Sequence, residues 1–166
     1  MVCANLLKPF PLIVVVLVQL CLLVSGQQSP IVYLRSFANN KVVSAANAGQ
    51  DQLVANLDVP DSAANAWEKF EWIKNSDGTV SLRTLINGKY VCADLDREAK
   101  LIANKNWVQV WERFNVVNNA KDGTISLKAV ANGKFVGAQQ NLNNNPLTAN
   151  RDNNNSGWEK FYVVII

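Results

Sequence analysis

The sequence predicts an all-β domain, and three observations lead to that class. Apolar and polar residues alternate along several short segments, which is the period of a strand with one buried face. The alternating segments return in three repeats, and each repeat contains nearly the same tetrapeptide, at residues 67–70, 111–114 and 158–161. No stretch shows convincing helical periodicity.

Each repeat opens with two strands joined by a turn. The three opening segments are VYLRSFANNKVVSA, VSLRTLINGKYVCA and ISLKAVANGKFVGA. The turn residues at their centres are Asn39-Asn40, Asn87-Gly88 and Asn132-Gly133. Asn-Gly in this position predicts a two-residue type I′ turn, which requires positive φ at both residues, and Asn is the next most tolerant residue after Gly.

A third strand and a fourth strand complete each repeat. The third strands are expected at residues 53–56, 101–104 and 147–150, and the fourth begin with Trp-Glu-Lys/Arg-Phe. The Phe is in step with the apolar residues that follow it, so it is predicted to point into the core. Because a threefold core needs the same large side chain three times, we interpret the repeated Trp and Phe as structural rather than ligand-binding.

The number of repeats decides between two architectures. Four-stranded units of roughly 40 to 50 residues occur in β-propellers and in β-trefoils, but a propeller usually needs at least four blades to close. Three units therefore predict a β-trefoil, made of three four-stranded repeats with pseudo-threefold symmetry. The Asp-Gly pairs at 77–78 and 122–123 are expected to turn the chain between successive repeats.

The first 26 residues are predicted to be a signal peptide. Lys8 precedes the apolar segment PLIVVVLVQLCLLV, which is shorter than the ~20 residues of a membrane-spanning helix. We expect cleavage before Gln27, a secreted protein and a single domain at 27–166, with a retained anchor as the alternative. Removal of the leader lowers the formal charge from +3 to +2, so neither nucleic acid nor an anionic membrane is an expected partner.

The residue content argues against catalysis. The chain has no histidine, which excludes serine-type triads and most zinc sites, and we expect no metal and no cofactor. After cleavage Cys92 is the one remaining cysteine, and it is interpreted as a buried, inert thiol. The cluster of Asp94, Asp96 and Glu98 is replaced by amides in the third repeat, which suits sugar recognition better than acid/base chemistry.

The ordered set of motifs SLKAVANGKFVGA, AANAG, LVAN, LTANR and WEKF resembles the fascin-like β-trefoil modules appended to secreted glycoside hydrolases. The resemblance covers essentially the whole of 27–166. It implies a carbohydrate-binding domain with shallow sites repeated around the pseudo-threefold axis. Fascins that bundle actin use several trefoils in the cytosol, so an actin-binding role is a less favoured alternative.

The loop between the second and third strands differs among the repeats, and loops that vary on a rigid scaffold are the usual place for function. It contributes three pairs of candidate sugar-binding residues, and the repeated third-strand asparagines together with the non-repeated tryptophan complete the set. The candidates are Asn47, Asp51, Asp94, Asp96, Gln139, Asn141, Asn56, Asn104, Asn150 and Trp107. For the polar residues the alternative is that they bond to their own backbone in turns.

These observations favour a secreted, lectin-like monomer that binds a polysaccharide such as a β-glucan through several weak sites. A second hypothesis is a protein-binding trefoil, acting as an inhibitor or a cytokine-like ligand. The longest insert, LDVPDSAANA, shows no obvious anchor for such a partner. A weaker third hypothesis is an enzyme that uses Asp94 and Asp96.

Overall fold

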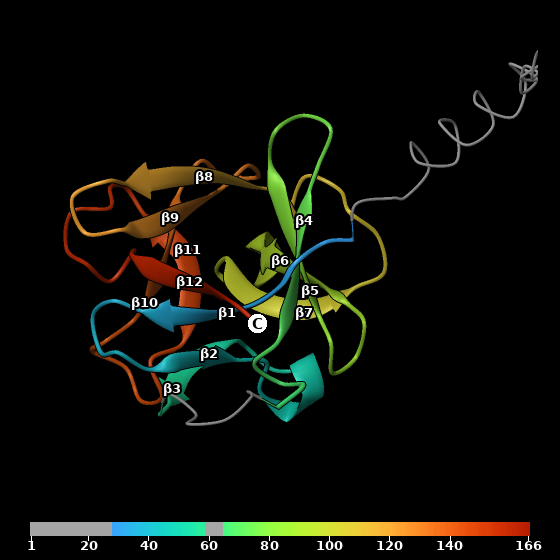
Figure 1. Cartoon of the computed structure of the whole chain (residues 1–166), viewed down its shortest axis with the longest axis horizontal. Helices are drawn as coiled ribbons and strands as arrows, with labels where there is room; N and C mark the ends of the chain where they lie inside the picture. The colour runs from blue at the N-terminus through green and yellow to red at the C-terminus, as the bar shows by residue number, and fades with distance from the viewer. Residues whose placement is uncertain (1–27, 59–64) are drawn as a thin grey trace, which may run out of the picture.

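The computed structural model describes residues 28–58 and 65–166 (Figure 1). The expected leader and part of the longest insert lie outside the described residues. The described chain is all-β as predicted, with two three-residue 3₁₀ turns and no α-helix. None of its helical segments is long and apolar enough to cross a membrane.

The described residues contain twelve strands and two 3₁₀ turns. They are β1 (Ile31–Ser36), β2 (Val42–Ser44), η1 (Asn47–Gly49), β3 (Val54–Leu57), β4 (Phe70–Lys74), β5 (Val80–Thr84), β6 (Tyr90–Asp94), η2 (Leu95–Arg97), β7 (Lys100–Lys105), β8 (Phe114–Asn119), β9 (Thr124–Ala129), β10 (Phe135–Ala138), β11 (Leu147–Arg151) and β12 (Phe161–Ile165). The third strands thus lie where the sequence predicts them, within one or two residues.

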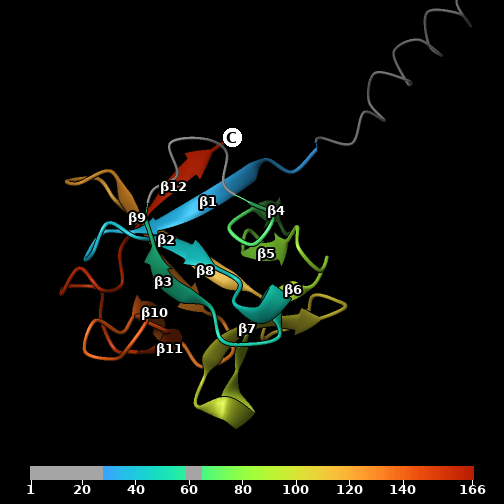
Figure 2. The ribbon, with the colours of Figure 1, turned by 90° about the horizontal axis from the view of Figure 1, so that it is seen from below.

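Six strands form a closed antiparallel ring. Strand β1 pairs with β4, β4 with β5, β5 with β8, β8 with β9, β9 with β12, and β12 with β1. Figure 2 shows β1 and β12 side by side, with Val32 opposite Ile165 in the register. Closing the ring leaves none of these six strands as a free edge.

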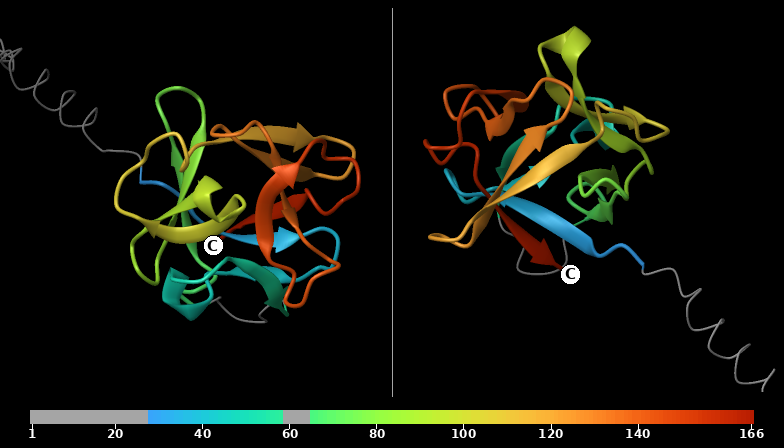
Figure 3. Two further views of the ribbon diagram at one scale, coloured as in Figure 1. Left: turned by 180° about the vertical axis from the view of Figure 1, so that it is seen from behind. Right: turned by 90° about the horizontal axis from the view of Figure 1, so that it is seen from above.

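The other six strands form three pairs that cover one end of the ring. These pairs are β2–β3, β6–β7 and β10–β11, and they surround a common centre in the left panel of Figure 3. Backbone hydrogen bonds join them there: Leu53 N–H donates to the Leu101 carbonyl at 2.8 Å, and Leu147 N–H donates to the Leu53 carbonyl at 2.8 Å.

The core is built from equivalent residues of the three repeats. The buried triplets are Phe70, Phe114 and Phe161, then Leu34, Leu82 and Leu127, then Leu53, Leu101 and Leu147. The interpretation of the repeated aromatics as core residues is therefore correct for the phenylalanines. The tryptophans are not part of this core: Trp67 is 42 % exposed and Trp111 and Trp158 are half-buried. They lie in the turn that precedes β4, β8 or β12, three residues before the Phe that begins the strand.

The turns between the first two strands of each repeat differ from the prediction. Positive φ occurs at Gly88 but not at Asn87, and likewise only at the second residue in the other two repeats. The connection is four residues long, since Thr84 N–H bonds to the Lys89 carbonyl at 3.0 Å and Gly88 N–H bonds back to the Thr84 carbonyl at 3.1 Å. Type I′ is therefore wrong. The Asn side chain instead bonds to Lys89 N–H at 2.9 Å and to the Ala103 carbonyl at 3.0 Å, which ties the turn to β7.

Candidate functional site

A surface pocket of about 380 Å³ lies where the chain leaves β7 and returns to begin β8. The lining residues all come from this one segment of the chain. They are Asn104, Lys105, Asn106, Trp107, Gln109, Val110, Trp111 and Glu112. The course of a single connection therefore determines the shape of this β7–β8 pocket.

Hydrogen bonds to neighbouring strands hold the connection in place. Ser81 on β5 donates its hydroxyl to the Glu112 carbonyl at 2.8 Å, and Ala93 N–H on β6 donates to the Trp111 carbonyl at 2.9 Å. Within the segment, Gln109 N–H donates to Oε2 of Glu112 at 2.7 Å. These hydrogen bonds thus attach the pocket to the ring, through β5, and to the strand pairs that cover one end of the ring, through β6.

Two tryptophans give the pocket its apolar surface. Trp107 is 70 % exposed, and Trp111 is half-buried. The Lys105 ammonium lies 5.3 Å from the centroid of the Trp111 ring, within the range of a cation–π contact. Within residues 28–58 and 65–166 no cation lies over the Trp107 ring, which is exposed at the pocket.

The pocket also contains a buried carboxylate. Glu112 is 3 % exposed, and burying a carboxylate is costly unless it is hydrogen-bonded. Within residues 28–58 and 65–166 no ion pair involves Glu112. A carboxylate offers about four acceptor positions and Gln109 N–H uses one of them, so Glu112 keeps acceptor capacity for a donor in the pocket.

Cys92 lies next to the pocket and is fully buried. Its thiol donates to Oδ1 of Asn104, with a sulfur–oxygen distance of 3.4 Å. Burial raises the pKa of Cys92 to about 11, although the Lys105 charge acts in the opposite direction. The thiolate, which is the reactive form, is therefore scarce at neutral pH.

We expect Cys92 to resist alkylation in the native protein. A shift from 9.0 to about 11 reduces the thiolate fraction about 100-fold, since each pKa unit is tenfold, and burial blocks access in addition. Iodoacetamide labelling at pH 8 should be at least that much slower in buffer than in guanidinium chloride. Equal rates in the two solvents would contradict the buried position of the thiol.

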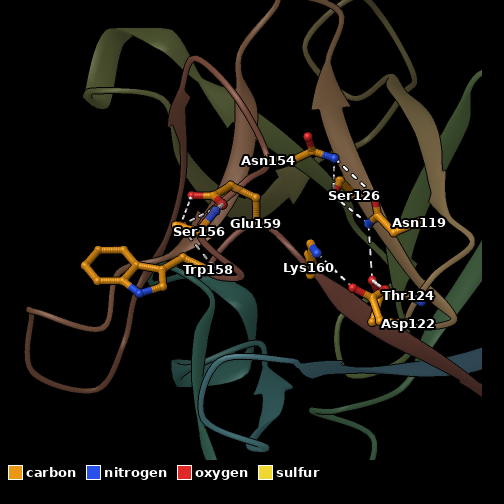
Figure 4. A network of polar contacts seen from close by, with 9 residues as sticks. All are labelled: Asn119, Asp122, Thr124, Ser126, Asn154, Ser156, Trp158, Glu159 and Lys160. Atoms are coloured by element: carbon orange, nitrogen blue, oxygen red, sulfur yellow. Dashed lines mark hydrogen bonds and ion pairs between the residues drawn. The ribbon is translucent and has the colours of Figure 1, made fainter.

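A related β11–β12 pocket of about 290 Å³ lies at the corresponding place in the third repeat. It is lined by Asn150, Arg151, Asp152, Asn153, Ser156 and Glu159. Figure 4 shows Ser156 directed at Glu159, and the Ser156 hydroxyl lies 2.9 and 2.8 Å from the two carboxylate oxygens. Arg151 Nε donates to Oε1 of Glu159 at 3.0 Å. Glu159, unlike Glu112, is therefore paired with a cation.

Beside this pocket a polar network joins β8, β9 and the segment before β12 (Figure 4). Asn154 donates to Oδ1 of Asn119 at 3.1 Å and to the Ser126 hydroxyl at 3.2 Å. Lys160 donates to Oδ2 of Asp122 at 2.8 Å. This bond, followed by the bonds from Thr124, lowers the pKa of Asp122 to about 2.

The Asp122 contact predicts a pH-dependent contribution to stability. A carboxylate with a lowered folded-state pKa stabilises the fold above its unfolded pKa, and that contribution is lost as pH falls through the folded value. Asp122→Asn should therefore be less stable than wild type at pH 7, and the difference should shrink between pH 3.8 and about 2. Urea unfolding across this range, with the exposed Asp51→Asn as control, measures it. A difference that stays constant with pH would contradict the assignment.

In the first repeat the equivalent carboxylate has a neutral partner. Glu68 is 5 % exposed and accepts from the Ser44 hydroxyl at 3.1 Å. Residues 59–64, which belong to this connection, are outside the described part of the chain. A further pocket of about 310 Å³ is formed by Gln28, Ser29, Pro30, Trp72 and Lys74.

Several residues predicted from the sequence lie at these pockets. Asn104 and Trp107 line the β7–β8 pocket, and Asn150 lines the β11–β12 pocket. Gln139 is buried and donates to Oδ1 of Asn150 at 3.1 Å. Asn56 is exposed at the corresponding place on β3.

The remaining predicted site residues lie outside the three pockets. Asn47, Asp51, Asp96 and Asn141 are exposed and line none of the three pockets. Asp94 is buried, with one carboxylate oxygen 3.7 Å from Arg97 Nε. The structure thus divides the predicted set between the pockets and the variable loops.

Sequence reasoning missed five residues of the β7–β8 pocket that contribute polar or aromatic groups: Lys105, Asn106, Gln109, Trp111 and Glu112. The sequence contains one pattern that could have identified Glu112. A glutamate returns at the same place in all three repeats, beside a core Phe, and all three copies are buried. Within the described chain no group of three or more His, Cys, Asp or Glu side chains is placed to hold a metal ion.

Comparison with known proteins identifies the family. Residues 23–161 match a family described as a domain of unknown function, DUF7910. The chain belongs to this family. No curated protein matches the sequence of this DUF7910 domain.

Solved structures with the same fold share little sequence with the DUF7910 domain. They include a designed threefold-symmetric protein, ThreeFoil (TM-score 0.70, 13 % identity, covering 82 % of this chain and 99 % of that one). A GlcNAcα1-4Gal-releasing endo-β-galactosidase from Clostridium perfringens matches with TM-score 0.69 and 11 % identity over 82 % of this chain and 32 % of the enzyme. A mosquitocidal holotoxin matches with TM-score 0.70 and 14 % identity over 82 % and 16 %. These similarities concern the fold, which is β-trefoil-like.

Proposed function

We propose that this protein is a non-catalytic, lectin-like domain that binds a polysaccharide through the β7–β8 pocket. The observation that carries the proposal is the combination in that pocket of an uncovered indole, Trp107, with a buried carboxylate, Glu112. An aromatic face packs against the C–H surface of a pyranose ring, and a carboxylate accepts hydrogen bonds from hydroxyl groups.

The polar side chains around Trp107 suit a sugar. Asn104 and Gln109 carry amides that both donate and accept, and both line the pocket. Lys105 and Glu112 bring one charge of each sign, so the pocket has no excess charge to select an acidic or a basic sugar. A neutral polymer such as a β-glucan is the ligand that this arrangement favours.

The composition of the pocket supports binding rather than hydrolysis. Glycoside hydrolysis uses two carboxyl groups at a defined separation, and Glu112 is the one carboxylate among the residues that line the pocket. One solved neighbour is an endo-β-galactosidase that releases GlcNAcα1-4Gal. This chain covers 32 % of that enzyme, so the similarity concerns one part of it.

The remaining features of the proposal follow from the sequence. We assign the domain as a fascin-like carbohydrate-binding module, a β-trefoil of three four-stranded repeats related by a pseudo-threefold axis. The apolar segment after Lys8 makes it a secreted protein whose leader is cleaved before Gln27. We propose that it acts as a monomer, without a cofactor and without stable membrane association.

Replacement of Trp107 tests the pocket. The protein should be retained on at least one polymer in a panel of insoluble β-glucans and chitin, and Trp107→Ala should weaken retention by about fivefold or more. Loss of an aromatic stacking contact is worth about 1 kcal/mol or more, and 1.4 kcal/mol is tenfold in affinity. Bound fractions measured against polymer concentration give the ratio.

The control is Leu142→Ala, which removes an exposed apolar side chain (52 % exposed) outside the three pockets. It should bind as wild type does. If folded wild-type protein is retained on no polymer, polysaccharide binding is wrong. If Trp107→Ala binds as tightly as Leu142→Ala, binding occurs at another place, for which the exposed variable-loop residues Asp51 and Asp96 are the next to test.

A further inference from the structure

The two related pockets differ in how their aromatic residue is covered. In the β11–β12 pocket the Arg151 guanidinium carbon lies 4.5 Å from the centroid of the Trp158 ring. The same side chain donates to Glu159 at 3.0 Å. Trp158 does not line the pocket, whereas Trp107 and Trp111 both line the β7–β8 pocket.

A glycine makes room for this arrangement. A Cβ atom at Gly137 on β10 would lie 3.1 Å from Cγ of Arg151, which is tighter than ordinary contacts between side chains. The equivalent residue on β6 is Cys92, which pairs with Ile102 as Gly137 pairs with Thr148. In the second repeat the Cys92 side chain therefore occupies the space that corresponds to the one beside Gly137. In the third repeat Gly137 leaves that space to the Arg151 side chain.

The cation of the β7–β8 pocket is held less firmly. Lys105 takes the place of Arg151, but its ammonium is 5.3 Å from the Trp111 centroid and it makes no ion pair within residues 28–58 and 65–166. A lysine is a single charged point on a flexible stem, whereas the planar guanidinium stacks on an aromatic ring and pairs with a carboxylate at once. A ligand can displace the lysine at lower cost.

We propose that Arg151 closes the β11–β12 pocket to sugars, so that of these two pockets only the β7–β8 pocket binds. Arg151 covers Trp158, which corresponds to Trp111, and pairs with Glu159, which corresponds to Glu112. Asn153 follows Asp152 where Trp107 follows Asn106, so the third repeat also lacks a second aromatic surface. This inference rests on the proposed function for its ligand and deepens it by assigning which pocket is used.

Hydroxyl-radical footprinting with mass spectrometry tests the proposal, since it reports the oxidation of each tryptophan separately. The probes are the β-1,3-linked and β-1,4-linked glucose hexasaccharides. Wild type is compared with Arg151→Ala and with Arg151→Lys, which keeps the charge and removes the planar group. Arg83→Ala, which removes a half-exposed arginine paired with Glu71 at 3.2 Å, is the matched control.

Without sugar, oxidation of Trp158 should rise several-fold in both Arg151 variants and stay unchanged in Arg83→Ala, while Trp107 keeps its wild-type rate. Unchanged Trp158 oxidation in folded Arg151 variants would overturn the proposal. This comparison needs no ligand, so it decides the role of Arg151 even if neither hexasaccharide binds.

With sugar, the wild-type protein should show protection at Trp107 and none at Trp158, and Arg151→Ala should gain protection at Trp158. Protection of Trp158 in the wild type would overturn the proposal and leave the proposed function standing. Absence of protection at Trp107 in every variant would count against glucan binding at the β7–β8 pocket.

Discussion

Replacing Phe114 with alanine is expected to lower the free energy of unfolding by about 3–5 kcal/mol. Phe114 is fully buried and lies where β8 pairs with both neighbours in the ring, opposite Val80 on β5 and Ala129 on β9. Truncation removes apolar contacts and leaves a cavity, and the closed ring limits how far the strands can move to fill it.

Urea unfolding of the variant measures the change, with Val117→Ala as control. Val117 lies on the same strand with 36 % of its surface exposed, so its truncation should cost less than about 1 kcal/mol. A loss below that value for Phe114→Ala would contradict the assignment of the repeated Phe to the core.

Replacing Asn87 with alanine is expected to cost about 2–4 kcal/mol, because several backbone groups lose their partner at once. The Asn87 amide donates to the carbonyls of Ala48 at 2.8 Å and Ala103 at 3.0 Å. Its oxygen accepts from Lys89 N–H at 2.9 Å. One side chain therefore holds a turn, the edge of β7 and the 3₁₀ turn of the first repeat.

The equivalent asparagines provide a graded comparison. Asn132 bonds to Lys134 N–H and to the Ala149 carbonyl, without a counterpart of the Ala48 contact in the described residues. Asn87 Oδ1 also accepts a hydrogen bond from the Thr84 hydroxyl, and the residue equivalent to Thr84 in the third repeat is Ala129. Asn132→Ala should therefore be less destabilising than Asn87→Ala by about 1–2 kcal/mol, the value of two hydrogen bonds. Equal losses in urea unfolding would show that the Ala48 and Thr84 contacts contribute nothing.

Much of the fold could be predicted because it depends on local periodicity. The alternation around Phe70, Phe114 and Phe161 places their side chains on the buried face of a strand, and the structure confirms this. The turn type could not be predicted in the same way. Asn87-Gly88 permits a type I′ turn, but the bonds of Asn87 to Ala48 and Ala103 are long-range and stabilise a different backbone conformation.

The candidate site was only partly predictable. Trp107 could be predicted as a site residue because it interrupts the repeat, and it lines the β7–β8 pocket. Glu112 could not be predicted in this way, because a glutamate beside an arginine is typical of a solvated surface. Its burial depends on the return of the chain to β8 and on the Gln109 N–H bond, which is a property of the folded connection.

The sequence by itself determined the all-β class, the threefold repetition and the core phenylalanines, because alternation and repeat length act on each strand locally. Only the tertiary structure decided how the copies of the repeated Trp-Glu pair are covered. In the third repeat Arg151 lies over Trp158 and pairs with Glu159, because Gly137, on another strand, leaves space for it. In the second repeat Lys105 lies over Trp111 without an ion pair to Glu112 in the described residues. Such a difference arises from residues that meet only after the strands have paired.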